Sequence, residues 1–497
     1  MKNKLNAQFF KRSWLLFVLV AMITLSACTF QSGQPAPPTI PTQSTSATLE
    51  NGSTVQEENQ TAVESPEPSI TEEINVPEAT GTVVVDDLAS IDPTGQHVYF
   101  WYFAEPQSPI DQALNQVVDQ FNQTNPNGIF IDAYNQSTAQ EVISRTLPLL
   151  NTPDAPALLM TNPEVVYRLA IGISDLEPFL TSTKWGFSQD EAAQLIPGML
   201  EQVQYPEFSS GMYAFPISRD AELLYYNLEW LSDLDRFAGP LSPQELADTA
   251  CAATNQSMRR LQQDSLSGLQ LYPGLNSFAA LTAAFGGSIF QPEQTNYVLN
   301  TDASLQAMQY LQKLSKDGCL DLTDDYALLP DHFSRAETAF ILDAATDISE
   351  VQQTVSQDLA FAWDVSGFPA QDGTNAPLIL PGVNLSITNT TPEQMLAAWT
   401  FIQYFQSSEA QNIWIPATGE FPALGQAGAE AAMPAGYFKT LENLQNAPAI
   451  PVFPGMEEID QLVHDTMGSI ADGAAVQPAL DALQRSAKQI TSTYFDR

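Results

Sequence analysis

Residues 211–227, with the sequence GMYAFPISRDAELLYYN, constrain the fold of this chain more than any other segment. The apolar runs 212–215 and 221–227 each predict a β-strand, and a polar interruption containing Arg219 and Asp220 separates them. Two extended runs joined in this way are typical of a chain that leaves one sheet and enters another. We therefore expect Arg219 and Asp220 to lie between two packed bodies, in the groove that separates them.

Alternating strand and helix patterns precede this segment. The apolar runs 98–103, 128–134 and 157–160 predict strands, and the residues between them carry apolar side chains at helical spacing. Ser108 and Pro109 mark a helix start, with serine as the N-cap and proline in the first position. This alternation predicts an α/β fold with a mainly parallel sheet. A chain of 497 residues is also long for one core, so we expect at least two packed bodies.

The second half of the chain continues the alternation with weaker signals. Residues 332–342 have helical spacing, and we expect a helix there. Residues 378–387 predict a strand, which Pro381 and Gly382 interrupt because proline cannot donate a hydrogen bond to a neighbouring strand.

The amino terminus has the features of a targeting segment. A basic start is followed by an apolar stretch and then by Leu-Ser-Ala-Cys at residues 25–28. This order is typical of a bacterial lipoprotein signal, in which Cys28 takes a lipid and residues 1–27 are removed. The alternative is an ordinary secretory signal with a chance cysteine.

Residues 28–93 are rich in Ser, Thr, Pro, Gln and Glu, with almost no aromatic side chains. Such a segment cannot bury enough apolar surface to offset the entropy of ordering, so it predicts a disordered stalk. We divide the chain into a signal peptide (1–27), this stalk (28–93) and a folded part (94–497). The division predicts a protein at the cell surface, anchored to the outer face of the cytoplasmic membrane by its N-terminal lipid.

The charge balance excludes several partners. The chain has 58 acidic and 18 basic side chains, and four of the basic ones lie in the signal segment, which leaves a formal charge of −44 from Cys28 onward. Nucleic-acid binding requires clustered basic side chains, and binding to an anionic membrane surface does too. We therefore expect neither kind of partner.

Two cysteines, Cys251 and Cys319, remain once Cys28 is lipidated. Outside the cytoplasm such a pair often forms a disulfide, which we predict here, with two buried free thiols as the alternative. The bond would place the helix that carries Cys251 beside residues 316–319.

Catalytic signatures are scarce. His97, His332 and His464 are far apart and lack the spacing of a zinc site. We find no nucleophile elbow, phosphate-binding loop, GxGxxG fingerprint or EF-hand loop. We therefore expect no cofactor, no metal and no catalysis.

Aromatic side chains near the ends of predicted elements are more informative. Trp101 and Tyr102 end the first strand, where open α/β sheets place ligands, and Trp363 and Trp414 also lie near element ends. Aromatic rings with a few polar groups suit the faces and hydroxyls of sugars. For any single ring the alternative is packing in a core or an interface.

Several segments together carry a family resemblance. In chain order they are Phe100-Trp101-Tyr102 before a helix that ends at Phe121, residues 211–216 with 224–227, the turn Phe285-Gly286-Gly287, residues 380–383 before a helix containing 397–401, and residues 407–411 with 419–422. In this order and spacing, residues 95–425 resemble the extracellular solute-binding proteins of family 1. These are receptors of ATP-binding-cassette importers, related to maltose- and oligosaccharide-binding proteins.

The resemblance implies an α/β fold with two lobes, like the periplasmic binding proteins, that close on a ligand like a hinged clamp. The first lobe would comprise residues 95–218 and 377–425, and the second lobe 221–373 and 428–497. The ligand would be a mono- or oligosaccharide, with a polyol or a glycerophosphodiester as the alternative. The protein would act as a monomer without catalysis and would deliver the sugar to permease subunits in the membrane.

We expect the ligand to contact Trp101, Tyr102, Arg219, Asp220, Trp363 and Trp414. Arg219 would donate hydrogen bonds to sugar hydroxyls and Asp220 would accept them. The alternative for this pair is a hinge salt bridge or solvated loop charges. Two other functions stay open for the whole chain. One is a surface glycoside hydrolase, which needs a carboxylate pair with one raised pKa. The other is a stalked adhesion or scaffold protein.

Overall fold

The structure is a computed structural model of the whole chain. It describes residues 86–203, 211–258, 263–264, 266–291, 296–375, 377–424, 433–450 and 455–495. The predicted signal peptide, the lipidation site at Cys28 and most of the predicted stalk lie outside these ranges.

The first sheet has five strands in the order β2-β1-β3-β16-β4. They are β1 (His97–Tyr102), β2 (Phe130–Asn135), β3 (Leu158–Thr161), β16 (Asn384–Ile387) and β4 (Phe215–Pro216). β1 pairs in parallel with both β2 and β3, whereas β16 runs antiparallel to β3 and β4. The last two strands therefore come from parts of the chain far apart in sequence.

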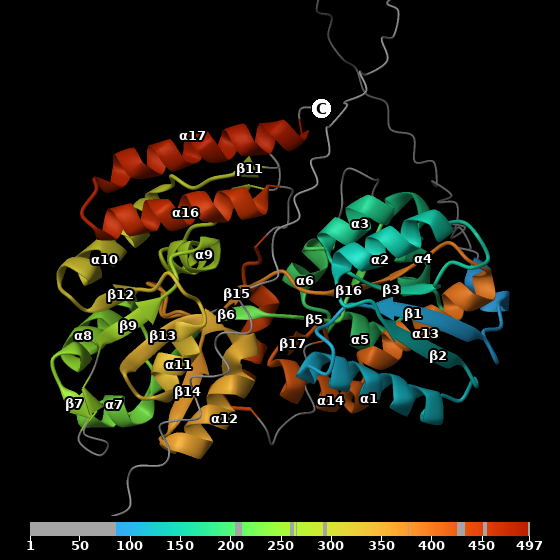
Figure 1. Cartoon of the computed structure of the whole chain (residues 1–497), viewed down its shortest axis with the longest axis horizontal. Coiled ribbons are helices and arrows are strands. Elements are labelled where there is room, and N and C mark those ends of the chain that lie inside the picture. Colours follow the sequence, from blue (N-terminus) through green and yellow to red (C-terminus); the bar gives the residue numbers. More distant parts are fainter. Residues whose placement is uncertain are drawn as a thin grey trace, which may run out of the picture. The chain divides into compact units, whose positions relative to one another are not determined.

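Helices pack around the first sheet (Figure 1). They are α1 (Pro109–Thr124), α2 (Ala139–Thr146), α3 (Pro163–Leu169), α13 (Pro392–Phe405) and α14 (Ser408–Thr418), with the short α4 (Glu177–Leu180), α5 (Gln189–Ala192) and α6 (Pro197–Glu201). The predicted start of α1 is confirmed, since the Ser108 hydroxyl accepts a hydrogen bond from the backbone N–H of Asp111. Leu114 and Phe121 on the apolar face of α1 are buried, and they share a core with Phe401 of α13.

The second sheet follows the order β12-β9-β13-β6-β14, with β15 pairing the start of β6. The strands are β6 (Ala221–Asn227), β9 (Ser267–Leu271), β12 (Leu320–Leu322), β13 (Thr338–Ala344), β14 (Trp363–Ser366) and β15 (Leu378–Ile379). β9 is parallel to β12 and β13, whereas β6 is antiparallel to β13 and β14. Every residue of β6 and β13 is buried, as expected for central strands covered on both faces.

Helices also surround the second sheet, and the long pair α16 and α17 packs side by side (Figure 1). They are α7 (Leu228–Asp233), α8 (Pro243–Thr254), α9 (Leu275–Ala284), α10 (Asp302–Lys316), α11 (Leu328–Ser334), α12 (Ile348–Asp358), α15 (Ala435–Asn443), α16 (Met456–Ala471) and α17 (Val476–Phe495). None of the helices within the described ranges combines the length and apolar character needed to cross a membrane.

The predicted α/β class with two lobes is confirmed, because two separate sheets each carry their own buried core. One helix was predicted wrongly. Residues 332–342 do not form a helix, since α11 ends at Ser334 and β13 begins at Thr338. Ala336 adopts a left-handed conformation with φ of 58°, which ends the helix, and the apolar run that follows pairs with β6 and β9.

The interruption at Pro381 and Gly382 proves to be a passage between the two sheets. β15 pairs with β6 in the second sheet, whereas β16 pairs with β3 and β4 in the first sheet. Residues 378–379 therefore belong to the second sheet, whereas the family resemblance placed residues 377–425 in the first lobe. The chain crosses a few residues later.

Ordered structure begins earlier than residue 94. A short 3₁₀ helix spans Asp87–Ser90, and the Asp86 carboxylate that caps it also accepts hydrogen bonds from the hydroxyls of Ser182 and Thr183. The Trp185 indole donates to the backbone carbonyl of Leu88. Residues 86–93, which composition alone assigned to the stalk, thus pack on the first lobe.

Cys251 in α8 and Cys319 directly before β12 are joined by a disulfide that spans 68 residues of sequence. The bond fastens α8 to the edge of the second sheet, in the arrangement that the pairing implied.

We expect replacement of both cysteines by alanine to lower the free energy of unfolding by roughly 2–4 kcal/mol, because the cross-link restricts the unfolded chain. Denaturant unfolding of the wild-type chain and the Cys251→Ala/Cys319→Ala variant measures this loss. Adding reductant should lower the wild-type midpoint and leave the variant unchanged. Equal midpoints for both chains would contradict a closed disulfide.

Candidate functional site

The two lobes are joined at a junction built from crossing segments. In the first, β4 of the first sheet leads through β5 (Ser218–Arg219) into β6 of the second. Residues 380–383 form the second and connect β15 to β16. A third follows α14, where β17 (Phe421–Pro422) pairs antiparallel with β5. Extended segments side by side suit a hinge, because small rotations at a few residues can turn one lobe against the other.

Arg219 ties these segments together from the inside. Its side chain is only 1% exposed. The guanidinium donates to the carbonyls of Ser218 and Val383 at 2.8 and 3.0 Å, to Asn384 Oδ1 at 2.6 Å and to Gln202 Oε1 at 2.7 Å. A buried guanidinium is tolerated only when its donors are paired, and here the partners come from two crossing segments and the loop after α6. Arg219 therefore serves the junction itself.

Trp414 and Glu420 tie the third crossing segment to the first. The Trp414 indole, buried in α14, donates to the hydroxyl of Ser218 at 2.8 Å, and that hydroxyl donates to Glu420. Trp414 also packs edge-on against Phe405 at 5.2 Å. Its ring is thus part of the junction packing.

Five acidic side chains gather at the junction, and we call them the junction carboxylates: Asp220, Glu222, Asp343, Asp347 and Glu420. Asp220 links the lobes' connecting strand to the second lobe, since its carboxylate accepts from the backbone N–H and the hydroxyl of Thr346 at 3.2 and 3.0 Å. Glu222 and Asp343 are buried, while Asp220, Asp347 and Glu420 are partly exposed.

Crowding and burial change the acidity of this group. Burial, together with the charge of Glu420, raises the pKa of Asp220 to about 7. Burial and the charges of Asp220 and Asp347 raise the pKa of Glu222 to about 8. The pKa values of Asp343, Asp347 and Glu420 are also raised, in each case mainly by burial. Near neutral pH the junction therefore offers both carboxylate acceptors and protonated acids that can donate.

Aromatic side chains of the second lobe lie beside these acids. Tyr326 is 40% exposed and donates its hydroxyl to Asp347 Oδ2 at 3.0 Å. Its ring meets that of Tyr272 at 6.1 Å, and Tyr272 in turn meets His464 at 5.1 Å. Exposed rings next to carboxylates form a surface that can stack on a sugar and bond its hydroxyls.

The other predicted contact residues are not at the junction. Tyr102 is buried and donates its hydroxyl to Asp111. Trp363 stacks on Tyr225 at 5.9 Å and pairs with Asn227, at the far end of β6 from the junction, roughly 20 Å away for a strand of this length. Trp101 is partly exposed and lines a separate cavity in the first lobe. The structure thus brings together Arg219, Asp220 and Trp414 out of the predicted set.

Sequence reasoning missed Glu222, Asp343, Asp347, Tyr272 and Tyr326. A signal existed for two of them, because Glu222 and Asp343 are charged residues inside otherwise apolar strands. Asp343 directly follows residues 332–342, which were predicted to form a helix, so the strand that carries it was not recognised. In the part of the chain that the structure describes, no group of acidic, His or Cys side chains is arranged to hold a metal ion.

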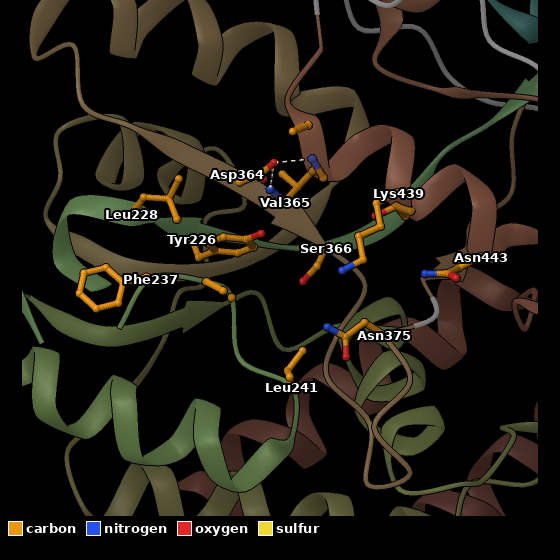
Figure 2. A pocket seen from close by; sticks show the side chains of 15 residues that line it. Tyr226, Leu228, Phe237, Leu241, Asp364, Val365, Ser366, Asn375, Lys439 and Asn443 are labelled. Atoms are coloured by element: carbon orange, nitrogen blue, oxygen red, sulfur yellow. Dashed lines mark hydrogen bonds between the residues drawn. The ribbon is translucent and has the colours of Figure 1, made fainter. Parts of the chain in front are cut away.

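A cavity of about 330 Å³ lies within the second lobe (Figure 2). Tyr226 and Ser366 line it from the sheet, while Lys439 and Asn443 of α15 and Asn375 extend toward it from around the rim. None of its lining residues belongs to a crossing segment. It is therefore separate from the junction.

Two α/β lobes joined by crossing segments define the two-lobed class of solute-binding fold. A family model described as bacterial extracellular solute-binding protein matches residues 116–442. The chain belongs to this family. No curated protein matches it in sequence.

Many solved structures match the fold. The cyclic α-maltosyl-1,6-maltose binding protein from Arthrobacter globiformis is 16% identical, with a TM-score of 0.64, over 80% of this chain and 99% of that one. The sugar-binding protein MalE from Xanthomonas citri is 16% identical, with a TM-score of 0.64, over 80% of this chain and 98% of that one. UgpB from Mycobacterium tuberculosis, in complex with glycerophosphocholine, is 16% identical, with a TM-score of 0.58, over 80% of this chain and 98% of that one. At such identities the likeness shows the fold alone.

We expect Arg219→Ala to lower the free energy of unfolding by roughly 3–5 kcal/mol, because it leaves several buried acceptors without a donor. Arg335→Ala is the matched control, since that guanidinium lies at the surface in ion pairs with Asp331 and Glu337 and should cost less than about 1 kcal/mol. Denaturant unfolding measures both changes. Similar small losses for the two variants would show that Arg219 does not hold the junction.

We expect the chain to become less stable as the pH rises from about 5 to 8. Asp220 and Glu222, with raised pKa values of about 7 and 8, keep protons in the folded chain that the unfolded chain releases near pH 4. Thermal denaturation at pH 5, 6.5 and 8 measures the trend. Glu222→Gln should make the fall in stability with pH smaller. Exposed carboxylates are ionised in both the folded and the unfolded chain over this range, so they do not contribute to the fall. A wild-type midpoint that stays constant or rises with pH would contradict the raised pKa values.

Proposed function

We propose that the chain is the receptor of an ATP-binding-cassette importer and binds a carbohydrate at the junction of its two lobes. The observation that carries the proposal is the juxtaposition of the junction carboxylates with the exposed ring of Tyr326. Carboxylates accept hydrogen bonds from sugar hydroxyls, and a ring offers a flat apolar surface to the face of a pyranose. Proteins of similar fold include the cyclic α-maltosyl-1,6-maltose binding protein and the sugar-binding protein MalE, which supports the same ligand class.

The hinge geometry suggests how binding would be reported. A sugar held by Asp220 on the connecting strand and by Tyr326 on the second lobe gains further contacts when the first lobe closes on it. The ligand would therefore shift the population toward the closed form. Permease subunits in the membrane would recognise that form, and no bond of the sugar would change.

Location and assembly complete the proposal. Lipid on Cys28 would anchor the chain to the outer face of the cytoplasmic membrane, and residues 29–85 would link the anchor to the lobes. The receptor would act as a monomer. The family match supports a place outside the cytoplasm.

Isothermal titration calorimetry of the purified chain tests the proposal. The titrants are a panel of mono- and oligosaccharides. We expect one saturable ligand class, and we expect Tyr326→Ala to weaken its binding roughly tenfold or more through loss of the ring. Tyr326→Phe is the control, since it keeps the ring and removes only the hydroxyl, which donates to Asp347 and accepts from the backbone N–H of Ala344.

Unchanged binding in Tyr326→Ala would place the ligand away from the junction. Turnover of a sugar would favour a hydrolase instead, and the absence of binding across the panel would contradict a carbohydrate receptor.

A further inference from the structure

One face of the first sheet is only partly covered at β1 and β2, and it is aromatic. Along β1, alternate residues are buried and exposed, with Val98 and Phe100 inward and Tyr99 outward. Helices α1 and α13 contribute to the core on the inward face. Sheets with parallel strands normally carry helices on both faces. On this outer face Trp101 packs against the core that contains Val142 and Ile143 of α2, whereas Tyr99 and Tyr134 stay exposed.

Three rings on this face share one cavity. Trp101 and Tyr134 are opposite each other in the pairing of β1 with β2, and Tyr99 lies two residues before Trp101, so all three side chains point to the same side. Tyr99 and Tyr134 are each 45% exposed, and their ring centroids are 6.2 Å apart. The cavity has a volume of about 510 Å³.

Polar groups surround the rings, and most of them are already paired. Arg145 donates to Gln136 at 2.7 Å and forms an ion pair with Glu141 at 3.0 Å. The Tyr134 hydroxyl donates to Asp132. Asp154 completes the polar part of the lining. Because the one cation is neutralised and carboxylates outnumber it, the cavity does not favour an anion, whereas paired groups of this kind can still exchange hydrogen bonds with hydroxyls.

All lining residues of this cavity belong to the first lobe. A molecule bound there would not contact the second lobe or a crossing segment. It would therefore not be the solute that closes the lobes.

From these observations we propose a second carbohydrate site, formed by Tyr99, Trp101 and Tyr134, that binds a neutral polysaccharide chain. Exposed rings that lie together on one face form the kind of contiguous apolar patch that marks an interaction site. A long neutral glycan fits better than a small solute, because the rings lie on an open sheet face along which a chain can extend. This inference goes beyond the proposed function and does not depend on it.

Affinity electrophoresis of the full chain in gels that contain neutral polysaccharides tests the site. The panel comprises an α-glucan, a β-glucan, a mannan and a xylan. We expect one or more of them to retard the wild-type chain, and each of Tyr99→Ala and Tyr134→Ala to weaken that binding roughly tenfold.

Phe130→Ala is the matched control, because Phe130 is a 50% exposed ring on the same face that does not line the cavity. It should be retarded like the wild-type chain. Tyr326→Ala, which alters the junction, should be retarded equally, and this separates the outcome from that of the junction site.

Three results would overturn the proposal. They are the absence of retardation in every gel, retardation that survives Tyr99→Ala and Tyr134→Ala, and equal loss in Phe130→Ala. Light scattering adds a fourth. If the wild-type chain is a dimer and Tyr134→Ala is a monomer, the face binds a second copy of the chain and not a glycan.

Discussion

The passage between the two sheets depends on one buried positive charge. The Arg219 guanidinium has its hydrogen bonds with Gln202, Val383 and Asn384, which come from segments far apart in sequence. Because a guanidinium cannot lose its proton at any ordinary pH, those acceptors must stay in place around it. The directional bonds fix how the crossing segments lie against one another, which apolar packing alone would define less sharply.

The junction carboxylates are a second constraint, of opposite sign. Arg219 lowers the pKa of Glu420, but burial outweighs that effect and the net pKa of Glu420 is raised. A single nearby cation therefore does not neutralise the group. Crowded buried acids cost folding free energy and contribute little to a core, so their presence at a junction between lobes fits a site that exchanges hydrogen bonds with a ligand.

Local signals in the sequence were reliable where short-range physics decides the outcome. Ser108 caps α1 through its hydroxyl, as predicted, and Ser242, Thr301 and Thr391 cap later helices in the same way. The helix expected over residues 332–342 failed because Ala336 takes a left-handed turn and a buried strand follows, and periodicity does not distinguish a short buried strand from a helix. Candidate contact residues fared less well, since a tryptophan such as Trp414 has the same composition signal in a core as in a binding site.

The sequence by itself determined the α/β class, the two bodies and the place where the chain passes between them, because alternating apolar periods and a polar break in residues 211–227 are local properties. Only the tertiary structure decided what Arg219 and Asp220 do there. It buried Arg219 among backbone carbonyls, placed Asp220 against Thr346 and gathered acids from β6, from β13 and from directly before β17 into one group. It also left Tyr99 and Tyr134 exposed on a sheet face that α2 covers only in part. Burial and the distances between charges are properties of the folded chain, and no single segment contains them.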